Sequence, residues 1–270
     1  VLPLTHKQIK VEDILSVKNV LSGRKLDWVI NTAAFHKVDE CEENSEKAWL
    51  INAIGPKNVA EVSCSIKANV VYRDGNIEIT LEDEFNNAPL LDTMHEKEMH
   101  FVLVSNDMEK YYHLHPQKKH EGLFIINQQL EPGTYQAFVD VTPKNHVYSV
   151  HPIELQIGDK ITSTTSLNSD KNWVKVNKGV HVTLNSISAK EDEHVPLTFN
   201  TELTPQPYLG ALGHVIIFDE QLTDYIHVHP ESPDSTTFYA HFPKKGMYKI
   251  WAEFKFNDEV HRFTYNIKVA

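Results

Sequence analysis

Two histidine patterns with the same spacing are the feature of this chain that could most directly do chemistry. In both patterns a single histidine is followed, 13 residues later, by the sequence His-x-His-Pro. The two sets are His100, His113 and His115, and His214, His227 and His229. Imidazole nitrogen is a preferred ligand of transition metals at neutral pH. The patterns therefore predict metal binding.

The sequence around the two histidine sets is also repeated. His100-Phe-Val-Leu-Val resembles His214-Val-Ile-Ile-Phe, and the Gly-Thr-Tyr that ends at Tyr135 resembles the Gly-Met-Tyr that ends at Tyr248. An internal repeat of this length indicates one structural module used twice.

Each histidine set should lie on one face of a β-hairpin. If residues 99–104 and 111–115 pair so that Val102 lies opposite His113, alternation along the strands brings the three histidines of the first copy to one face. The same register in the second copy sets Ile216 opposite His227. Three imidazoles on one face could hold zinc or copper. Whether the two sets act separately or together is left open by the sequence.

The first copy offers further ligands, namely Met94, His95 and Met99. Methionine sulfur beside imidazole is a soft ligand set that suits Cu(I). The second copy has Tyr208, Leu209 and Gly213 at these positions. We therefore expect the first copy to be the tighter metal site.

Two other interpretations of the histidines remain open. They could form a structural network of hydrogen bonds where a strand leaves the sheet, since a buried polar ring needs partners. Catalysis would require an adjacent acid or base, and the sequence does not assign that role to nearby Glu98, Asp107, Glu109 or Asp219. We expect a binding protein that is not an enzyme.

Composition limits the classes of partner. The chain has 270 residues and a formal net charge of −11, which argues against nucleic acid. It contains no run of ~18 apolar residues that would span a membrane. Two cysteines, Cys41 and Cys64, cannot build a disulfide framework. We expect a metal ion or another protein as partner, and the sequence does not predict the oligomeric state.

The first 65 residues have an α/β pattern. Residues 26–31 are predicted to form a short strand, and residues 11–21 a helix. A second helix is expected over residues 44–54, with Asn44 or Ser45 as its N-cap. Gly55-Pro56 should break it before another helix begins at Lys57.

After Ser65 the pattern becomes β. Alternating segments such as Tyr135–Val139 are separated by turn signals at short intervals, which is typical of antiparallel sandwiches. We predict one sandwich over residues 66–158, a Ser/Thr-rich linker over 159–170 and a second sandwich over 171–270. The expected fold is mainly β, with two tandem sandwiches preceded by a short α/β segment.

Residues 99–116 and 213–230 resemble a bacterial module of secreted or lipid-anchored proteins, which often accompanies heavy-metal-binding and efflux components. This resemblance covers most of residues 66–270. It implies an extracytoplasmic, Ig-like or cupredoxin-like sandwich with a connection to copper. For the β half it therefore implies a secreted or membrane-anchored location at the cell envelope.

Residues 27–42 and 48–60 resemble the dTDP-4-dehydrorhamnose reductase family, cytoplasmic Rossmann-fold enzymes that use NADPH on a sugar nucleotide. The resemblance implies that Asn31, Ala33 and Ala34 border the cofactor and that a helix bearing Asn52 follows. His36 replaces the usual threonine. The glycine-rich turn is expected before residue 1, and no Tyr-x-x-x-Lys pair appears at Tyr111 or Tyr135. We therefore expect a partial Rossmann segment that does not bind NADPH. The alternative function for the chain is that of a sugar-nucleotide oxidoreductase like this family, which would be incomplete and inactive.

Overall fold

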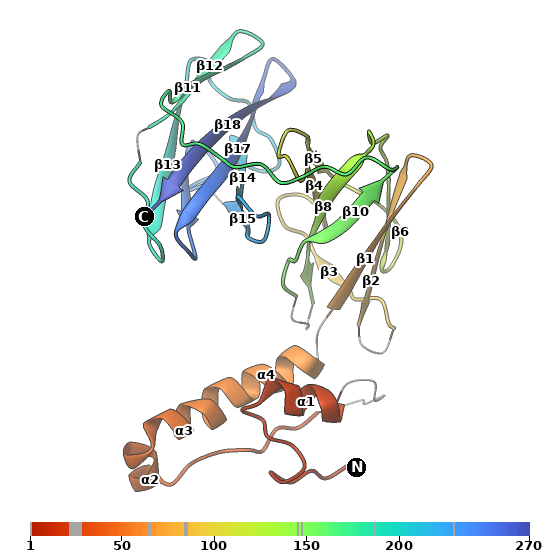
Figure 1. The fold of residues 1–270 in the computed structure, drawn as a ribbon, viewed down its shortest axis with the longest axis vertical. Coiled ribbons are helices and arrows are strands. Elements are labelled where there is room, and N and C mark those ends of the chain that lie inside the picture. Colours follow the sequence, from red (N-terminus) through yellow and green to blue (C-terminus); the bar gives the residue numbers. More distant parts are fainter. Residues whose placement is uncertain are drawn as a thin grey trace.

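The computed structural model describes residues 2–21, 29–63, 66–83, 86–144, 146, 148–185, 187–228 and 230–270. The molecule is mainly β, as predicted, with antiparallel sheets throughout its two sandwiches. Figure 1 shows a helical unit at the N-terminal end and the two sandwiches above it.

The N-terminal unit is helical in its described part. It contains α1 (Ile14–Leu21), α2 (Val38–Glu43), α3 (Ser45–Trp49), a π-helical turn η1 (Leu50–Ile54) and α4 (Gly55–Ser63). The expected strand over 26–31 is not formed by residues 29–31, which lack regular structure; residues 26–28 lie outside the described part.

The predicted helix break at Gly55-Pro56 is wrong. The Gly55 N–H donates to the Leu50 carbonyl oxygen, which is the five-residue spacing of a π-turn. Pro56 follows this π-turn directly, and α4 continues through it although Pro56 has no N–H to donate. The chain therefore continues in helical conformation from Ser45 to Ser63.

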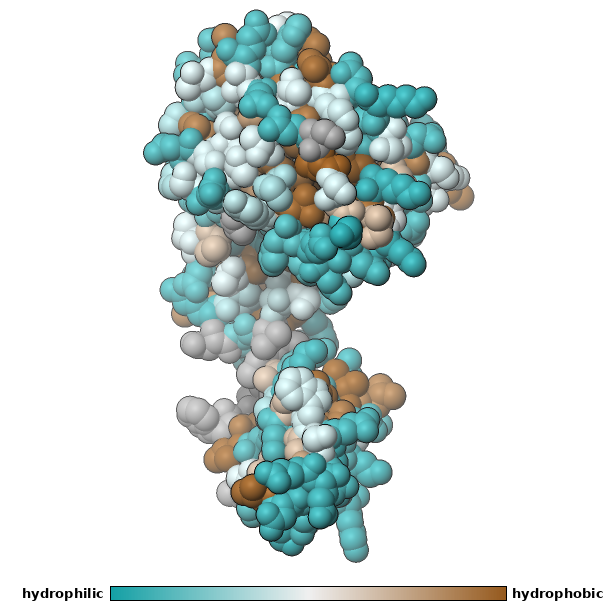
Figure 2. Space-filling model, turned by 90° about the vertical axis from the view of Figure 1, so that its left-hand side faces the viewer, coloured by the Kyte–Doolittle hydropathy of each residue, from teal (hydrophilic) through white to brown (hydrophobic). Residues whose placement is uncertain are grey.

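A small apolar core joins α1 to α4, and it contains Val11, Val17, Leu21, Val59 and Val62. Other apolar side chains of this unit stay exposed, as the brown patches in the lower part of Figure 2 show. They include Leu15, Ile30, Val38 and Trp49. Among the described helices, none has the length and apolar character needed to cross a bilayer.

The first repeat is a sandwich of two four-stranded sheets in the orders β1-β2-β7-β6 and β10-β8-β4-β5, with a short β3-β9 ladder beside them. Phe101, Leu103 and Tyr135 are among the residues of its core. Its strands are β1 (Ile66–Arg73), β2 (Asn76–Asp83), β3 (Leu91–Asp92), β4 (His100–Ser105), β5 (Tyr111–Leu114), β6 (Gln117–His120), β7 (Leu123–Asn127), β8 (Gly133–Asp140), β9 (Thr142–Pro143) and β10 (Ile153–Ile157).

The second repeat has the same plan, with sheets in the orders β11-β12-β13-β16 and β15-β14-β17-β18. Phe199, Tyr248 and Phe254 are among the residues of its core. Its strands are β11 (Val174–Asn177), β12 (Val180–Leu184), β13 (His194–Thr201), β14 (Gly213–Asp219), β15 (Tyr225–Val228), β16 (Thr237–His241), β17 (Gly246–Phe256) and β18 (Glu259–Val269).

The two repeats pack against each other through matching faces. Strands β4 and β14 are buried at every residue, because one face of each covers the core of its own sandwich and the other face meets the opposite sandwich. A separate apolar cluster fills this boundary and draws on both repeats: Val102, Val104, Met108, Tyr111, Phe138, Ile216, Phe218, Leu222 and Trp251. Equivalent positions therefore meet across the boundary, as in an isologous interface.

Residues 158–173 join the repeats without regular secondary structure. They cross from one sandwich to the other in Figure 1 and are tied to the second repeat along the way. The Leu167 N–H donates to the Glu220 carboxylate, and the Asn266 N–H donates to Asp170. The connection is thus held against the protein.

Candidate metal centre

The hairpin registers predicted from the sequence are confirmed. Val102 lies opposite His113 in the β4–β5 pair, and Ile216 lies opposite His227 in the β14–β15 pair. Alternation then sends Phe101 and Leu103 into the core of their own sandwich, while His100 faces the other repeat.

The histidine faces of the two hairpins meet at the boundary between the repeats. The His100 and His214 rings are stacked with centroids 5.3 Å apart, and the His113 and His214 centroids are 5.1 Å apart. Six described histidines form this histidine cluster: His95, His100, His113, His115, His214 and His227. The described histidines of the two sets, which the sequence shows separately, are thus one group in space.

Three histidines are arranged as a ligand set that crosses the boundary. One ring nitrogen each from His100, His113 and His214 lies within 4.8 Å of the other two. The His113 side chain is fully buried, and His100 and His214 are 2% and 3% exposed. Two members come from the first repeat and one from the second.

The contacts of His100 define which of its nitrogens faces the cluster. Its Nε2 lies 3.2 Å from the Met94 carbonyl oxygen, which can only accept a hydrogen bond. Its Nδ1 lies 3.1 Å from His113 Nε2 and 3.3 Å from His115 Nε2. Neutral His100 therefore turns its lone pair toward two other imidazoles.

Two carboxylates hold the outer nitrogens of the hairpin histidines, each from the opposite repeat. His113 Nδ1 donates to Glu253 Oε2 at 2.8 Å, and His227 Nδ1 donates to Asp140 Oδ2 at 2.7 Å. His227 Nε2 then lies 2.7 Å from His214 Nε2. Carboxylate–histidine pairs of this kind fix the orientation and tautomer of metal-binding imidazoles.

Further contacts support the carboxylates. Tyr225 donates its hydroxyl hydrogen to Asp140 at 2.8 Å. Arg262 donates to Glu253 at 3.2 Å and to the Tyr111 carbonyl oxygen at 2.9 Å. The Tyr111 hydroxyl is buried and has no hydrogen-bond partner among the described residues.

Burial favours the neutral form of three imidazoles in the cluster, those of His100, His115 and His214, and the two carboxylates stay ionised. Burial, followed by neighbouring imidazoles, lowers the pKa of His100 to about 3 and that of His115 to about 4, and it lowers the pKa of His214 as well. Burial alone would raise the pKa of Glu253 and Asp140. The hydrogen bonds and charges of His113 and His227 outweigh that effect and hold both pKa values below the usual range. Neutral imidazole is the form that binds a metal.

His95 reaches the cluster from a strained turn. His95 and Glu96 have φ angles of 48° and 64°, the left-handed region, and Met94 and Lys97 exchange two backbone hydrogen bonds around them. This geometry is that of a type I′ hairpin turn, which favours Asn and Gly. The His95 ring lies 5.4 Å from those of His214 and His227. The second repeat builds the same turn with Leu209-Gly210.

The two methionines proposed as ligands are separated by the fold. Met99 is 2% exposed and belongs to the core of the first repeat, because residues next to each other on a strand point to opposite faces. The structure therefore does not bring Met99 to the histidines. Met94 lines the pocket beside them, and His229 lies outside the described residues.

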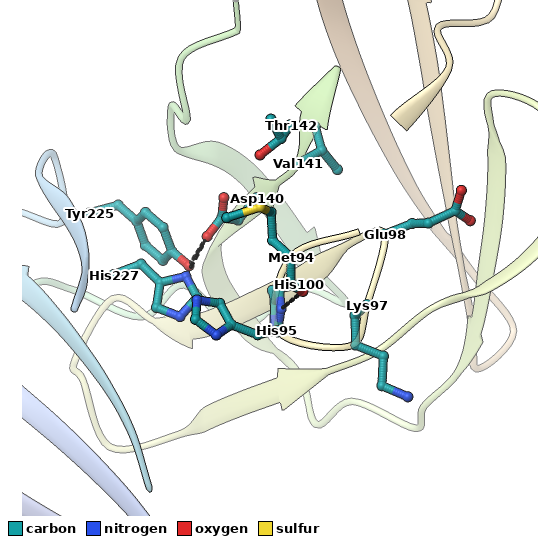
Figure 3. Close-up of a pocket in the computed structure, with 10 residues that line it drawn as sticks. All are labelled: Met94, His95, Lys97, Glu98, His100, Asp140, Val141, Thr142, Tyr225 and His227. Carbon is teal, nitrogen blue, oxygen red and sulfur yellow. Dashed lines mark hydrogen bonds and ion pairs between the residues drawn. The ribbon is translucent and has the colours of Figure 1, made fainter. Parts of the chain in front are cut away.

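A pocket of about 250 Å³ opens beside the histidine cluster. Figure 3 shows His95, His100 and His227 on its wall, with Asp140 bridging to Tyr225 and His227. The remaining lining comes from Met94, Lys97, Glu98, Val141 and Thr142. His113 and His214 are not among the residues that line the pocket, and both side chains are buried.

Sequence reasoning missed Asp140 and Glu253, although a signal for them was present. Each follows the repeated tyrosine, Tyr135 or Tyr248, by five residues, so the two copies carry an acid at the same position. In the sheets, Asp140 pairs with His100 and Glu253 with His214. The acids considered from the sequence were near the histidines in the chain rather than across the strands.

The residues expected to border a cofactor lie in the N-terminal unit, away from the histidine cluster. The Ala33 N–H donates to the Asn31 side chain, and the two residues line an apolar hollow of about 660 Å³. Ala34 is exposed. Asn52 makes two hydrogen bonds to the backbone of Phe35 and so holds this loop against the helices.

Two solved structures are similar to this chain at a low level. Two fibronectin type III domains of chicken tenascin share 10% identity, cover 75% of this chain and 98% of their own, and give a TM-score of 0.23. The Escherichia coli adhesin FdeC shares 10% identity over 77% of this chain and 65% of its own, with a TM-score of 0.24. Because these identities and TM-scores are low, the assignment of the fold class depends on the sheets described above and not on these structures.

The N-terminal residues are similar to sugar-nucleotide enzymes. Residues 1–75 match a family described as the RmlD substrate binding domain. The spore coat polysaccharide biosynthesis protein SpsK of Bacillus subtilis is 40% identical over 72 residues, which are 27% of this chain and 25% of SpsK. The dTDP-4-dehydrorhamnose reductase of Mycolicibacterium smegmatis is 35% identical over 72 residues, 27% of this chain and 21% of the reductase. The resemblance to this family in the first segment is confirmed, and the chain spans about a quarter of the length of these relatives.

A second family covers both sandwiches and so most of the chain. Residues 57–157 and 174–270 match the family described as a domain of unknown function, DUF8832. Because these residues make up more than half of the sequence, the chain belongs to the DUF8832 family.

Proposed function

We propose that this chain binds one transition-metal ion, copper or zinc, at a centre shared by its two repeats. His100, His113 and His214 supply the ligand nitrogens, and His95, His115 and His227 surround them. The centre is a binding site rather than an active site. We also propose that the protein is located at the cell envelope, and the resemblance of the β half to exported modules supports this location.

The observation that carries the proposal is the nitrogen pair at 3.1 Å between His100 Nδ1 and His113 Nε2. The outer nitrogens of both rings face acceptor-only oxygens, those of Met94 and Glu253, so each ring in its metal-binding, neutral form carries its hydrogen on the outer nitrogen and a lone pair on the inner one. Lone pairs that face each other need a cation between them. Two nitrogens bound to one tetrahedral metal at ~2.0–2.1 Å lie about 3.3–3.4 Å apart.

The ligand set narrows the choice of metal. Imidazole nitrogen suits zinc, copper and nickel, and for a given site Cu(II) binds more tightly than its neighbours in the first-row series. Because Met99 lies in the core, the described residues give less support to a soft Cu(I) set than the sequence did. We expect the affinity of the site to decrease in the order Cu(II), Zn(II), Co(II). Zn(II) and Co(II) should occupy the same site.

Calorimetric titration of the metal-free protein with Cu(II) and Zn(II) tests the proposal. We expect one equivalent of metal, and loss of that binding in His100→Ala and equally in His214→Ala, since the site needs both repeats. The control is the double variant His194→Ala, His241→Ala, which removes two histidines paired between β13 and β16, outside the cluster. It should bind like the original protein.

Two results would overturn the proposal. An absence of binding at micromolar metal would show that a shared proton, rather than a metal, satisfies the imidazoles, and the cluster would then be structural. Two independent equivalents, one lost with each repeat's histidines, would replace the shared centre with separate sites.

A further inference from the structure

Asp140 and Glu253 occupy equivalent positions in the two repeats, and each accepts a hydrogen bond from a histidine of the opposite repeat. Asp140 ends β8 beside His100, yet it accepts its hydrogen bond from His227 of the second repeat. Glu253 lies beside His214 on β17, yet it accepts from His113 of the first repeat. From this crossed arrangement we infer that Asp140 and Glu253 are the positioning residues of the metal centre. The inference rests on the proposed function.

The physical role of the carboxylates is to select a tautomer. An ionised carboxylate has no hydrogen to donate, so it holds the hydrogen of its imidazole on Nδ1. The Nε2 atom is then left with its lone pair and points into the cluster, toward His100 in the case of His113 and toward His214 in the case of His227. A partner that could donate instead would leave the ring free to present the wrong nitrogen.

The two positions are equivalent in sequence but differ in their surroundings. Glu253 is 2% exposed and is held by Arg262, whereas the Asp140 side chain is 22% exposed, borders the pocket and is held by Tyr225. His113, the partner of Glu253, belongs to the set of three close nitrogens, and His227 does not. Loss of the Glu253 charge should therefore weaken metal binding more than loss of the Asp140 charge.

The crossed contacts also tie the centre to the docking of the repeats. Separation of the sandwiches would remove His214 from His100 and His113, and it would take the carboxylate away from each hairpin histidine at the same time. Each repeat alone therefore has a histidine set without its orienting acid. The centre exists only in the docked arrangement.

The test compares amide and acid variants of the whole chain. Glu253→Gln and Asp140→Asn keep the shape of the side chain, but their amide NH2 group can donate a hydrogen bond to the imidazole. Glu253→Asp and Asp140→Glu keep the charge, and each places there the acid that the other repeat uses. Zn(II) affinity is measured by competition with a chromophoric chelator, and the tautomers of the histidines are measured by ¹⁵N NMR of the metal-free protein.

We expect the amide variants to lose about 10–100-fold in Zn(II) affinity, with the acid variants keeping most of it. The NMR spectra should show the Nδ1–H form of His113 and His227 in the original protein and a mixture in the corresponding amide variant. Asp219→Asn is the matched control, because Asp219 is a buried carboxylate at the far end of β14 that contacts Thr223, Asp224 and Lys244. It should lower stability without changing either readout.

The outcomes separate the two proposals. Unchanged Zn(II) affinity in both amide variants, or an Nε2–H form of His113 and His227 in the original protein, would overturn the positioning role while metal binding stands. If the original protein binds no metal, the proposed function fails, and the tautomer spectra still decide whether the carboxylates orient the rings.

Discussion

His113 of the first repeat donates a 2.8 Å hydrogen bond to Glu253 of the second, although the two residues are 140 positions apart in the chain. Both side chains are almost completely buried. The bond joins the hairpin of one sandwich to a central strand of the other, and its counterpart between His227 and Asp140 repeats the arrangement with the roles of the repeats exchanged. The boundary between the sandwiches is thus also the interior of the candidate site.

Acidification should destabilise the metal-free protein. The pKa of His100 is lowered to about 3 from the ordinary value of 6.5, and that of His115 to about 4. Below pH 6.5 the unfolded chain takes up protons at these residues while the folded chain does not, so the stability present above pH 6.5 falls as the pH decreases toward 4. Thermal unfolding in the presence of a chelator at pH 7.5, 6 and 5 measures this loss. His100→Gln should show a shallower dependence, and an equal slope in both proteins would contradict the assignment.

Removal of an aromatic ring at the boundary should undock the repeats. Trp251 is 2% exposed and stacks on Tyr111 with ring centroids 5.2 Å apart. Trp251→Ala should cost about 3–5 kcal/mol of unfolding free energy and weaken metal binding, because the ligands come from both sides. Denaturant unfolding and zinc titration measure the two effects. Phe199→Ala, in the core of the second repeat, is the control for a lost buried ring; if metal affinity falls equally in both, undocking is not the cause.

A methyl group at Gly213 should displace the strand that carries His214 and so disturb the metal centre. A Cβ there would lie 2.6 Å from the Phe254 ring and 2.9 Å from the Glu253 carbonyl oxygen, both inside the sheet that carries His214. Gly213→Ala should therefore cost about 1–3 kcal/mol and lower Zn(II) affinity. Chemical unfolding and chelator competition measure the two quantities. At Gly133 a Cβ meets mainly the movable Thr162 hydroxyl, so Gly133→Ala should be milder; the reverse order would refute this packing argument.

The reductase-like segment should not bind NADPH. The chain covers a quarter or less of the length of its reductase relatives. In the described structure the side-chain oxygen of Asn31 already accepts a hydrogen bond from the Ala33 N–H. Titration of the chain with NADPH, followed by cofactor fluorescence, should show no change up to about 1 mM, the upper end of common enzyme KM values. Saturable enhancement that disappears in Asn31→Ala would show that the segment forms a cofactor site after all.

Much of the local structure follows from the sequence. Alternation of apolar residues and the turn signals predict the strands, because side chains on a strand point to alternate faces and only one face can be buried in each core. The same alternation predicts that His100 and His113 share a face, and the pairing of Val102 with His113 confirms it. The repeat was visible from the spacing of the histidines alone.

The helical segment shows where local signals are insufficient. Gly55-Pro56 has the residues of a helix end, but a π-turn before Gly55 lets the chain continue as a helix. The strand expected before Asn31 would have needed neighbouring strands to hydrogen-bond with, and residues 29–31 have none in the described structure. Strand propensity cannot compensate for missing partners.

The sequence by itself determined two β modules and two histidine faces of matching register, since these depend on periodicity within a strand. Only the tertiary structure decided that the faces meet, that His100, His113 and His214 form one set, and that Asp140 and Glu253 cross between the repeats. The reason is physical: periodicity states which face of a strand is apolar or polar, whereas the partner of that face is chosen by the packing of Phe138 and Trp251 with the other sandwich.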